Sequence, residues 1–251
     1  MMNLFYSPHI DEDILELDEK ESKHSVRVLR LRKGDRVHLV DGTGGWYEAA
    51  IEDDHPRHCR LRILTRTPDH QPLPYALHLA ISPTKSADRF EWFLEKATEI
   101  GISEITPLLC QRTERTRLHI DRLERIIISA MKQALRAYKP VLHEPATLSD
   151  FASLERPGTK GIAHCIRTGQ SMKSGRIADS GDLPEPEGIT DLPRDKQYTL
   201  LVGPEGDFTE GEVKTALDSG YIPFHLGDAR LRTETAGVYI CAVISLRSAS
   251  S

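Results

Sequence analysis

Several features that identify common protein classes are missing from this sequence of 251 residues. No apolar run approaches the roughly twenty residues that a membrane-spanning helix needs, and the first residues do not read as a secretory signal. No Cys-x-x-Cys pair joins the four cysteines (Cys59, Cys110, Cys165 and Cys241), and no His-Glu-x-x-His pattern occurs among the eleven histidines. These absences predict a cytoplasmic protein with no membrane-spanning segment, no metal site and no disulfide framework.

A positive net charge is also missing, because the formal charge at pH 7 is −5. This total hides two local basic clusters. Lys23–Arg36 holds six basic residues against a single acid, Asp35, and basic residues again outnumber acids in Arg112–Lys139. Patches of this kind can attract phosphates even on an acidic protein. Each patch is equally consistent with an ordinary solvated face, so charge alone leaves nucleic-acid binding open.

The first 70 residues are predicted to form a small β-rich domain. Their apolar and β-branched runs, bounded by turn residues, predict strands at Arg36–Val40, Trp46–Ile51 and Arg57–Thr65, with a short helix at Glu19–Leu29. The proline-rich segment Thr67–Pro74 is the best candidate for a domain boundary. We therefore expect one domain over residues 1–70 and a second over residues 75–251.

In the second domain, strand and helix patterns alternate, which predicts an α/β fold with a parallel sheet and crossover helices. The expected helices are Asp88–Ile100 and Ile120–Ala137, and the expected strands are Tyr75–Ile81, Ile102–Leu109, Gly161–Cys165 and Tyr198–Val202. Residues 167–196 interrupt the alternation with a polar stretch rich in Gly, Pro, Ser and Asp. We expect the middle of this long loop to be mobile and to have no catalytic role.

Two strand–loop–helix units near the C-terminus carry the strongest functional signal. In the first, an apolar strand stops at Gly203, and Thr209 with Glu212 forms a capping box at the start of the next helix. Phe208 and Val213 are placed as the hydrophobic staple around that box. In the second, a strand ends at Leu226-Gly227, and Thr233 or Thr235 can cap the last helix. Since ligands of open α/β sheets bind beyond the carboxyl ends of strands, both loops should line one crevice.

The charges in these loops indicate the kind of ligand. Neither loop has the GxGxxG or GxxxxGK[ST] spacing of a phosphate-binding site. Both are acidic, and the acids are Glu205, Asp207, Glu210, Asp228 and Glu234. Carboxylates near a pocket suit a neutral or cationic ligand better than a polyphosphate. The alternative for each acid is a solvated residue favoured by the positive end of a helix dipole.

The two loops resemble the paired motifs of the 16S ribosomal RNA uridine-N3 methyltransferases, a family of the SPOUT superfamily. The match rests on GPEG at residues 203–206 and LRTETA at residues 231–236. It continues, with less specific motifs, through residues 88–101 and through His24, Val28–Arg30 and Lys33–Asp35. Two departures stand out. Asp207 replaces a glycine that often follows GPEG, and Ala134 replaces a serine ahead of Arg136.

The resemblance implies a C-terminal SPOUT-like methyltransferase domain with a deep trefoil knot and an N-terminal PUA-like β-barrel that helps to hold RNA. It implies a homodimer that uses S-adenosylmethionine to methylate N3 of a uridine in 16S rRNA, either naked or in the assembled small subunit. The alternatives are a SPOUT methyltransferase for another RNA, such as tRNA or a different rRNA position, and a non-catalytic RNA-binding protein.

The resemblance also assigns candidate residues. Arg232 is the first candidate to stabilise the uracil anion and Arg136 the second. The candidate proton acceptors are Glu205, Glu234, or hydroxide without help from the protein. Arg232 could instead pair with one of those two acids in a structural role. The candidate cofactor-binding residues are Leu201, Val202, Gly203, Pro204, Glu205, Gly206, Leu226, Gly227, Leu231, Arg232, Thr235 and Ala236. The candidate RNA-binding residues are Lys23, Arg27, Arg30, Arg32, Lys33 and Arg112.

Overall fold

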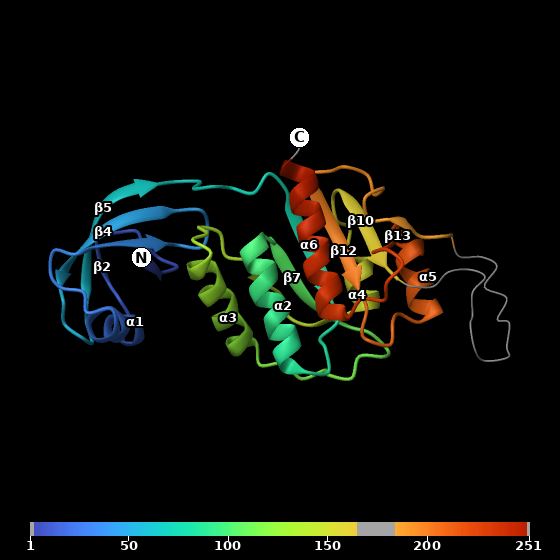
Figure 1. The fold of residues 1–251 in the computed structure, drawn as a ribbon, viewed down its shortest axis with the longest axis horizontal. Coiled ribbons are helices and arrows are strands. Elements are labelled where there is room, and N and C mark those ends of the chain that lie inside the picture. Colours follow the sequence, from blue (N-terminus) through green and yellow to red (C-terminus); the bar gives the residue numbers. More distant parts are fainter. Residues whose placement is uncertain (1–2, 165–183, 250–251) are drawn as a thin grey trace. The chain divides into compact units, whose positions relative to one another are not determined.

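The computed structural model describes residues 3–164 and 184–249, which divide into two compact units (Figure 1). The first unit comprises residues 1–72 and 127–139, and the second comprises residues 73–126 and 140–251. The break at 72/73 lies inside the proline-rich segment Thr67–Pro74. The grouping of residues 127–139 with the first unit differs from the predicted domain division. Most of the predicted loop 167–196 lies outside the described residues.

The first unit is built on a five-stranded sheet with the strand order β1-β3-β4-β5-β2. Strands β1 and β3 are parallel, and the other neighbours are antiparallel. The chain between β2 and β3 forms helix α1, which continues into a π-helical stretch, η1. The bounds are β1 Leu4–Tyr6, β2 Ile14–Glu16, α1 Glu19–Lys23, η1 His24–Val28, β3 Arg36–Val40, β4 Trp46–Asp53 and β5 Arg60–Thr67.

Residues 127–139 join the first unit through apolar and polar contacts. Met131 and Ala137 are buried in one cluster with Val40 of β3. The Lys132 ammonium group lies 2.7 Å from a carboxylate oxygen of Glu21 on α1. Local sequence patterns carry no information on such contacts, because they join segments about ninety or more residues apart.

The second unit contains a sheet with the strand order β11-β13-β10-β12-β6-β7-β8, and β9 also pairs with β7. Every pairing described in this sheet is parallel, which confirms the predicted α/β class. The strands are β6 Ala76–Ile81, β7 Glu104–Leu109, β8 Val141–Leu142, β9 Ala146–Thr147, β10 Thr159–Ala163, β11 Glu187–Gly188, β12 Gln197–Val202 and β13 Ile222–His225. The helices are α2 Ala87–Ile100, α4 Leu148–Ser153, α5 Glu210–Asp218 and α6 Thr233–Ala249. Helix α3 Ile120–Gln133 is divided, with residues 120–126 in the second unit and residues 127–133 in the first.

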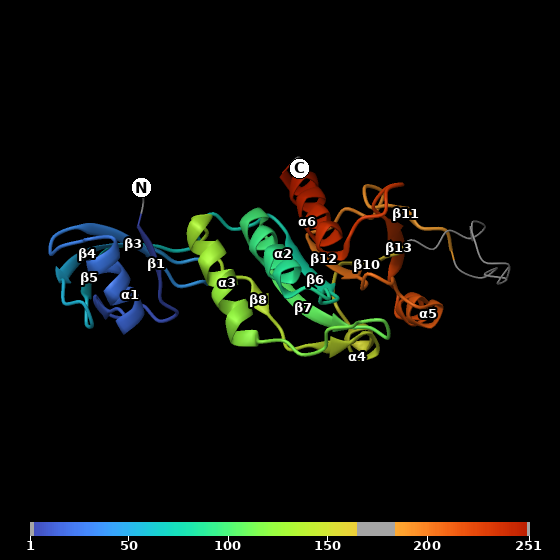
Figure 2. The same cartoon turned by 60° about the horizontal axis from the view of Figure 1, so that its bottom comes forward.

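Helices cover both faces of this sheet (Figure 1, Figure 2). Because side chains alternate along a strand, Ala80 and Ile81 of β6 point to opposite faces. Ala80 packs in a buried cluster with residues of α4 and α5. Ile81 faces Gly237 of α6, which also lies against Phe93 of α2. The sheet is therefore buried on both sides, as expected for parallel strands.

Most predicted elements are present, with some differences at their ends. The capping box of Thr209 and Glu212 is confirmed, and the staple residues Phe208 and Val213 share one buried cluster. Helix α3 ends at Gln133, four residues before the predicted end, and Leu135 beyond it has a φ of 54°. Neither threonine predicted to cap α6 lies ahead of the helix, because α6 begins at Thr233. Each helix in the described part of the chain is too short or too polar to span a bilayer.

Candidate functional site

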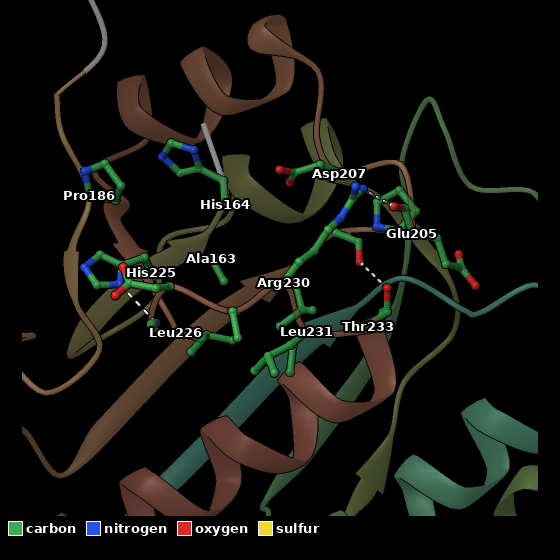
Figure 3. Close-up of a pocket in the computed structure, with 17 residues that line it drawn as sticks. Ala163, His164, Pro186, Glu205, Asp207, His225, Leu226, Arg230, Leu231 and Thr233 are labelled. Carbon is green, nitrogen blue, oxygen red and sulfur yellow. Dashed lines mark hydrogen bonds between the residues drawn. The ribbon is translucent and has the colours of Figure 1, made fainter. Parts of the chain in front are cut away.

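Three neighbouring strands of the second unit end at the same edge of the sheet. Strand β10 lies between β12 and β13, and Ala163 at its end is in register with Val202 on one side and Phe224 on the other. A cavity of about 400 Å³ opens beyond these ends (Figure 3). Its place is the one that open α/β sheets use for ligands. The predicted crevice lay beyond two strand ends, whereas the observed cavity lies beyond three.

Both predicted loops line this cavity. Of the twelve predicted cofactor-binding residues, the lining includes Val202, Gly203, Pro204, Glu205, Leu226, Gly227, Leu231 and Ala236. The lining also includes residues that were not predicted to bind the cofactor, namely Ala163, His164, Pro186, Asp207, His225, Asp228, Ala229, Arg230 and Thr233. The lining combines apolar side chains with a smaller number of polar and charged ones, a common division in ligand pockets.

Four predicted cofactor-binding residues do not line the cavity. Leu201 is fully buried in the core cluster that includes Ile162. Gly206, Arg232 and Thr235 are exposed to solvent. Sequence spacing located the loops correctly, but it did not resolve which side of each loop faces the ligand.

The first loop is held in a tight conformation. A Cβ atom on Gly203 would lie 3.1 Å from two ring carbons of Phe208, so a glycine is favoured at this position. Asp207, at the position where the family often has glycine, has a φ of 62°. Aspartate tolerates this left-handed conformation better than most residues, and its carboxylate accepts a hydrogen bond from the Phe208 N–H at 2.8 Å. Asp207 therefore holds a positive-φ conformation that a glycine at this position could also adopt.

Two hydrogen bonds join the first loop to the second. The buried Thr233 hydroxyl donates to the carbonyl oxygen of Gly203 at 3.1 Å. The exposed Arg230 guanidinium donates to the carbonyl oxygen of Glu205 at 3.2 Å. Figure 3 shows both contacts from the cavity side. The buried bond of Thr233 fixes the start of α6 against the end of β12. The bond of Arg230 is exposed to solvent.

The candidate acids differ in their surroundings. Glu205 lines the cavity, and its carboxylate accepts a hydrogen bond from the Lys85 backbone N–H at 3.0 Å. Glu234 is buried and does not line the cavity, and one of its carboxylate oxygens lies 3.8 Å from the guanidinium of Arg89. Glu205 therefore has the better position for accepting a proton from a ligand.

The two candidate arginines also differ in their surroundings. Arg232 is exposed beside the cavity, and among the described residues its side chain makes no hydrogen bond or ion pair. The predicted structural pairing of Arg232 with Glu205 or Glu234 is thus not found there. Arg136 belongs to the first unit, whereas the cavity is lined by residues of the second.

Arg112, a predicted RNA-binding residue, contacts the first loop. Its guanidinium donates to the carbonyl oxygen of Gly206 at 2.7 Å and approaches that of Phe208 at 3.4 Å. One carboxylate oxygen of Glu212 accepts a hydrogen bond from the neighbouring Gln111 N–H at 2.8 Å. The segment after β7 therefore supports the loop that lines the cavity.

His164 is a lining residue that sequence reasoning missed. It follows strand β10, is only 4% exposed, and faces the cavity from the third strand end (Figure 3). Burial lowers the pKa of His164, and the nearby Asp207 carboxylate acts in the opposite direction. The signal that could have identified His164 was the predicted strand at 161–165, but only the strand order brings its end between the two loops.

The remaining predicted RNA-binding residues lie together in the first unit. They are exposed cations at the end of α1, on η1 and just after it, namely Lys23, Arg27, Arg30, Arg32 and Lys33. Arg32 lies 3.7 Å from the Asp54 carboxylate. Exposed Val28 lies in the same segment. The cluster is accessible to a phosphate backbone.

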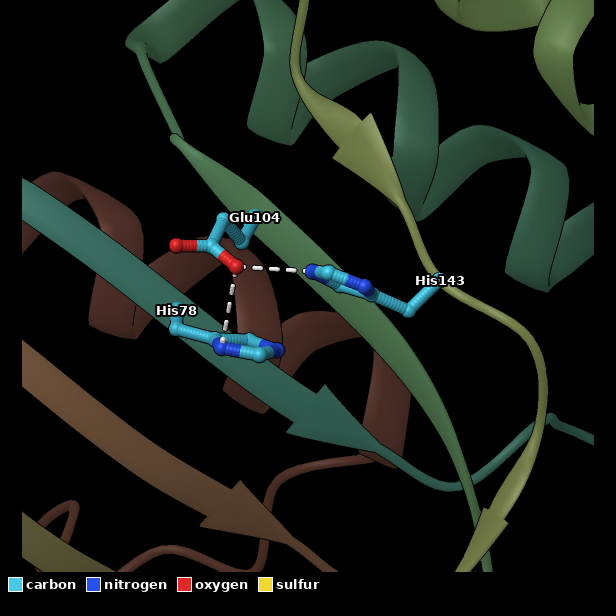
Figure 4. Close-up of side chains that lie close together, drawn as sticks. All are labelled: His78, Glu104 and His143. Atoms are coloured by element: carbon cyan, nitrogen blue, oxygen red, sulfur yellow. Dashed lines mark hydrogen bonds and ion pairs between the residues drawn. The ribbon is translucent and has the colours of Figure 1, made fainter. Parts of the chain in front are cut away.

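A second group of titratable residues lies at the start of β7, away from the cavity's strand ends (Figure 4). Its members are His78, Glu104 and His143. The His143 Nε2 lies 2.7 Å from the Glu104 carboxylate, and the His78 Nε2 lies 2.7 Å from the Thr106 hydroxyl. Burial lowers the pKa of His78 to about 4, against the effect of Glu104. His78 is therefore neutral at pH 7, and its contact with Glu104 is no ion pair there.

The contacts of this group favour hydrogen bonding over a role as metal ligands. The Arg156 guanidinium lies 3.5 Å from Nδ1 of His78, the atom that would face a shared ion. A cation at that point would meet the positive charge of Arg156. The same guanidinium lies 4.2 Å from the centre of the Phe151 ring, which holds it in place.

Known proteins resemble the chain over nearly its whole length. A family model described as an RNA methyltransferase domain matches residues 71–245, and one described as an RNA methyltransferase PUA domain matches residues 17–64. The ribosomal RNA small subunit methyltransferase E of Synechocystis is 30% identical over 94% of this chain and 74% of its own length.

Solved structures agree with the sequence comparisons. A probable rRNA-methyltransferase from Porphyromonas gingivalis is 34% identical, covers 99% of both chains and has a TM-score of 0.87. A ribosomal RNA small subunit methyltransferase E from Neisseria gonorrhoeae, bound to S-adenosyl methionine, is 26% identical over 98% of both chains, with a TM-score of 0.80. The five-stranded unit is thus a PUA-like half-barrel, and the parallel-sheet unit is a methyltransferase domain.

Proposed function

The chain belongs to the family of ribosomal RNA small subunit methyltransferase E, and from that premise we propose that it methylates N3 of one uridine in 16S rRNA with S-adenosylmethionine. The observation that carries this proposal is the cavity beyond three adjacent strand ends, which is lined in part by residues of both GPEG and LRTETA. The deep trefoil knot implied by the resemblance remains a prediction.

The chemistry of the cavity suits this cofactor. A volume of about 400 Å³ is within the usual range for small-molecule sites. Val202, Leu226 and Leu231 offer apolar surface for adenine. Glu205, Asp207 and Asp228 supply negative charge near a ligand that carries a sulfonium and an ammonium group. When bound, S-adenosylmethionine supplies an electrophilic methyl group.

The protein's own residues would position the uracil and stabilise its anion. N3 of uridine must lose a proton, and the negative charge then spreads to the two carbonyl oxygens. Arg232, exposed beside the cavity, is our candidate to stabilise that charge. Glu205, which lines the cavity, is our candidate to accept the proton. Glu234 has a positioning role in this scheme, because it is buried against Arg89.

Reverse transcription across 16S rRNA tests the proposal, because a methyl group on N3 blocks base pairing. RNA from the wild-type strain should give a stop at one uridine, and RNA from a strain lacking the gene should not. The wild-type gene should restore the stop. A stop that persists in the deletion strain, or none in the wild type, contradicts the proposal.

An Arg232→Ala variant tests the catalytic assignment. With purified protein, the rate of methyl transfer should fall by roughly 10²–10³ if Arg232 stabilises the developing charge. The affinity for S-adenosylmethionine should change little, because Arg232 does not line the cavity. Lys214→Ala, which removes an exposed cation from α5, is the control and should keep its rate. A fully active Arg232→Ala variant would exclude the assignment.

The substrate RNA can be identified in the same assay. Naked 16S rRNA, assembled small subunits and tRNA are offered in parallel with labelled cofactor. We expect transfer to the small subunit or its RNA and none to tRNA. Transfer to tRNA alone would favour the alternative of a methyltransferase for another RNA.

We propose that the exposed cations of residues 23–33 bind the RNA backbone. Arg27→Gln should weaken binding of all RNA sequences and lower the slope of log affinity against log salt by about 0.7–0.9, since one phosphate contact is lost. An unchanged slope would remove Arg27 from the interface. We further propose a cytoplasmic location, because the substrate is ribosomal RNA.

We propose a homodimer through α2 and α6, which pack together and expose apolar side chains. Trp92 is 43% exposed, Tyr239 is 43% exposed and Leu246 is 70% exposed. Analytical ultracentrifugation should show a dimer at micromolar concentration, and Leu246→Glu should shift it towards monomer. A wild-type monomer at that concentration would contradict the proposal.

A further inference from the structure

The charges around the cavity are strongly unequal. The described residues that line it include three acids, Glu205, Asp207 and Asp228, and two histidines. Arg230 is the single arginine or lysine among them. Its guanidinium is charged at every physiological pH. A ligand with one carboxylate would therefore find one permanently cationic partner in this lining.

The two other arginines of this region are unsuited to that role. Arg232 is exposed and does not line the cavity. Arg112 does not line it either, and its guanidinium holds the backbone of Gly206. Arg230 thus differs from the other two arginines in position, because it alone of the three lines the cavity.

We propose that Arg230 binds the carboxylate of the amino-acid part of S-adenosylmethionine and thereby selects cofactors that carry it. This inference rests on the proposed function, because it takes the cofactor from there. The same cofactor carries an ammonium and a sulfonium group, which the three acids complement. The single arginine complements the remaining charged group.

The contact that Arg230 makes in the structure is compatible with this role. One nitrogen of its guanidinium donates to the Glu205 carbonyl oxygen at 3.2 Å, so the side chain extends toward the first loop (Figure 3). A guanidinium has five N–H donors, so others remain for a ligand. Its planar shape suits a carboxylate, which can accept two parallel hydrogen bonds. Arg230 can therefore join the two loops and bind the ligand at once.

Isothermal titration calorimetry with matched ligands separates ligand binding from loop support. S-adenosylmethionine and its decarboxylated analogue differ only by the carboxylate. Arg230→Gln should lower the affinity for S-adenosylmethionine by roughly ten- to a hundredfold, the range for hydrogen bonds to charged groups. The same variant should lower the affinity for the decarboxylated analogue less than threefold. S-adenosylhomocysteine, which keeps the carboxylate and lacks the sulfonium charge, should follow S-adenosylmethionine.

Two further variants control the experiment. Arg230→Lys keeps the charge without the fork and should recover part of the affinity for the carboxylate-bearing ligands only. Lys214→Gln removes one exposed positive charge from α5 and should leave all three affinities unchanged. Thermal unfolding of each variant without ligand shows whether it is folded.

The outcomes distinguish the two proposals. Equal weakening of S-adenosylmethionine and its decarboxylated analogue would reduce Arg230 to a link between loops and overturn the inference. No weakening of either would overturn it as well. If the selective loss appears but the wild-type protein methylates no 16S rRNA, the Arg230 inference stands and the proposed substrate fails. A wild-type protein that binds none of the three ligands would overturn both.

Discussion

Replacing Thr233 with valine should destabilise the second unit by about 1–3 kcal/mol. The change keeps the shape of the side chain and removes the hydroxyl that donates to the Gly203 carbonyl oxygen at 3.1 Å. Thr233 is 4% exposed and Gly203 is buried, so water cannot easily replace the lost donor. A buried polar group left without a partner costs about 1–3 kcal/mol.

Urea unfolding followed by circular dichroism measures this cost, with the midpoint compared at constant slope. Thermal unfolding should agree, at roughly 2–4 °C of lost Tm per kcal/mol for a domain of this size. Thr233→Ser keeps the hydroxyl and should recover most of the loss. The affinity for S-adenosylmethionine should fall for valine and return for serine, because Thr233 and Gly203 both line the cavity.

Thr235→Val supplies the matched control, since Thr235 lies one half-turn away on α6 and is exposed. Exposed substitutions of this kind usually stay within about 0.5 kcal/mol. The reasoning would be refuted if the valine variant at position 233 were as stable as the wild type, or if the control lost as much.

Three other results are expected. Gly237→Ala should lower the free energy of unfolding by about 1–3 kcal/mol in the same urea assay, because its Cβ would lie 2.6 Å from a ring carbon of Phe93. The control is Gly211→Ala on α5, whose Cβ meets no atom within 4 Å and which should be neutral or stabilising. The pKa of His78 falls from 6.5 to about 4 on folding, so the unfolded chain binds the extra proton between these values. His78 should therefore contribute a loss of up to about 1.4 kcal/mol of stability per pH unit as the pH falls from 6.5 to about 4, and a His78→Gln variant with an equally steep profile would contradict this. Burial raises the pKa of Cys110 and of Cys241 to about 12, and Cys59 is buried too. Of the four thiols, at most one should therefore react with Ellman's reagent in the native protein at pH 8, and all four should react after unfolding.

Local patterns predicted the elements of the fold well. Strand β3 has the predicted bounds, and α5 begins at the predicted capping box, because periodicity and capping act over a few residues. The strands of two or three residues and the six-residue helix α4 were missed, since segments this short carry too little pattern. The end of α3 was placed too late, because its continuation was amphipathic although the chain turns at Leu135.

The sequence by itself determined the family and the two loops of the candidate site, because GPEG, LRTETA and the capping box are contiguous motifs whose chemistry is visible residue by residue. The tertiary structure alone decided that β10 lies between β12 and β13, which adds His164 to the cavity. It also decided that Arg230 faces the cavity while Arg232 faces solvent, two positions further along the chain. The physical reason is that strand order and side-chain direction depend on contacts between distant segments, and spacing along the chain does not encode them.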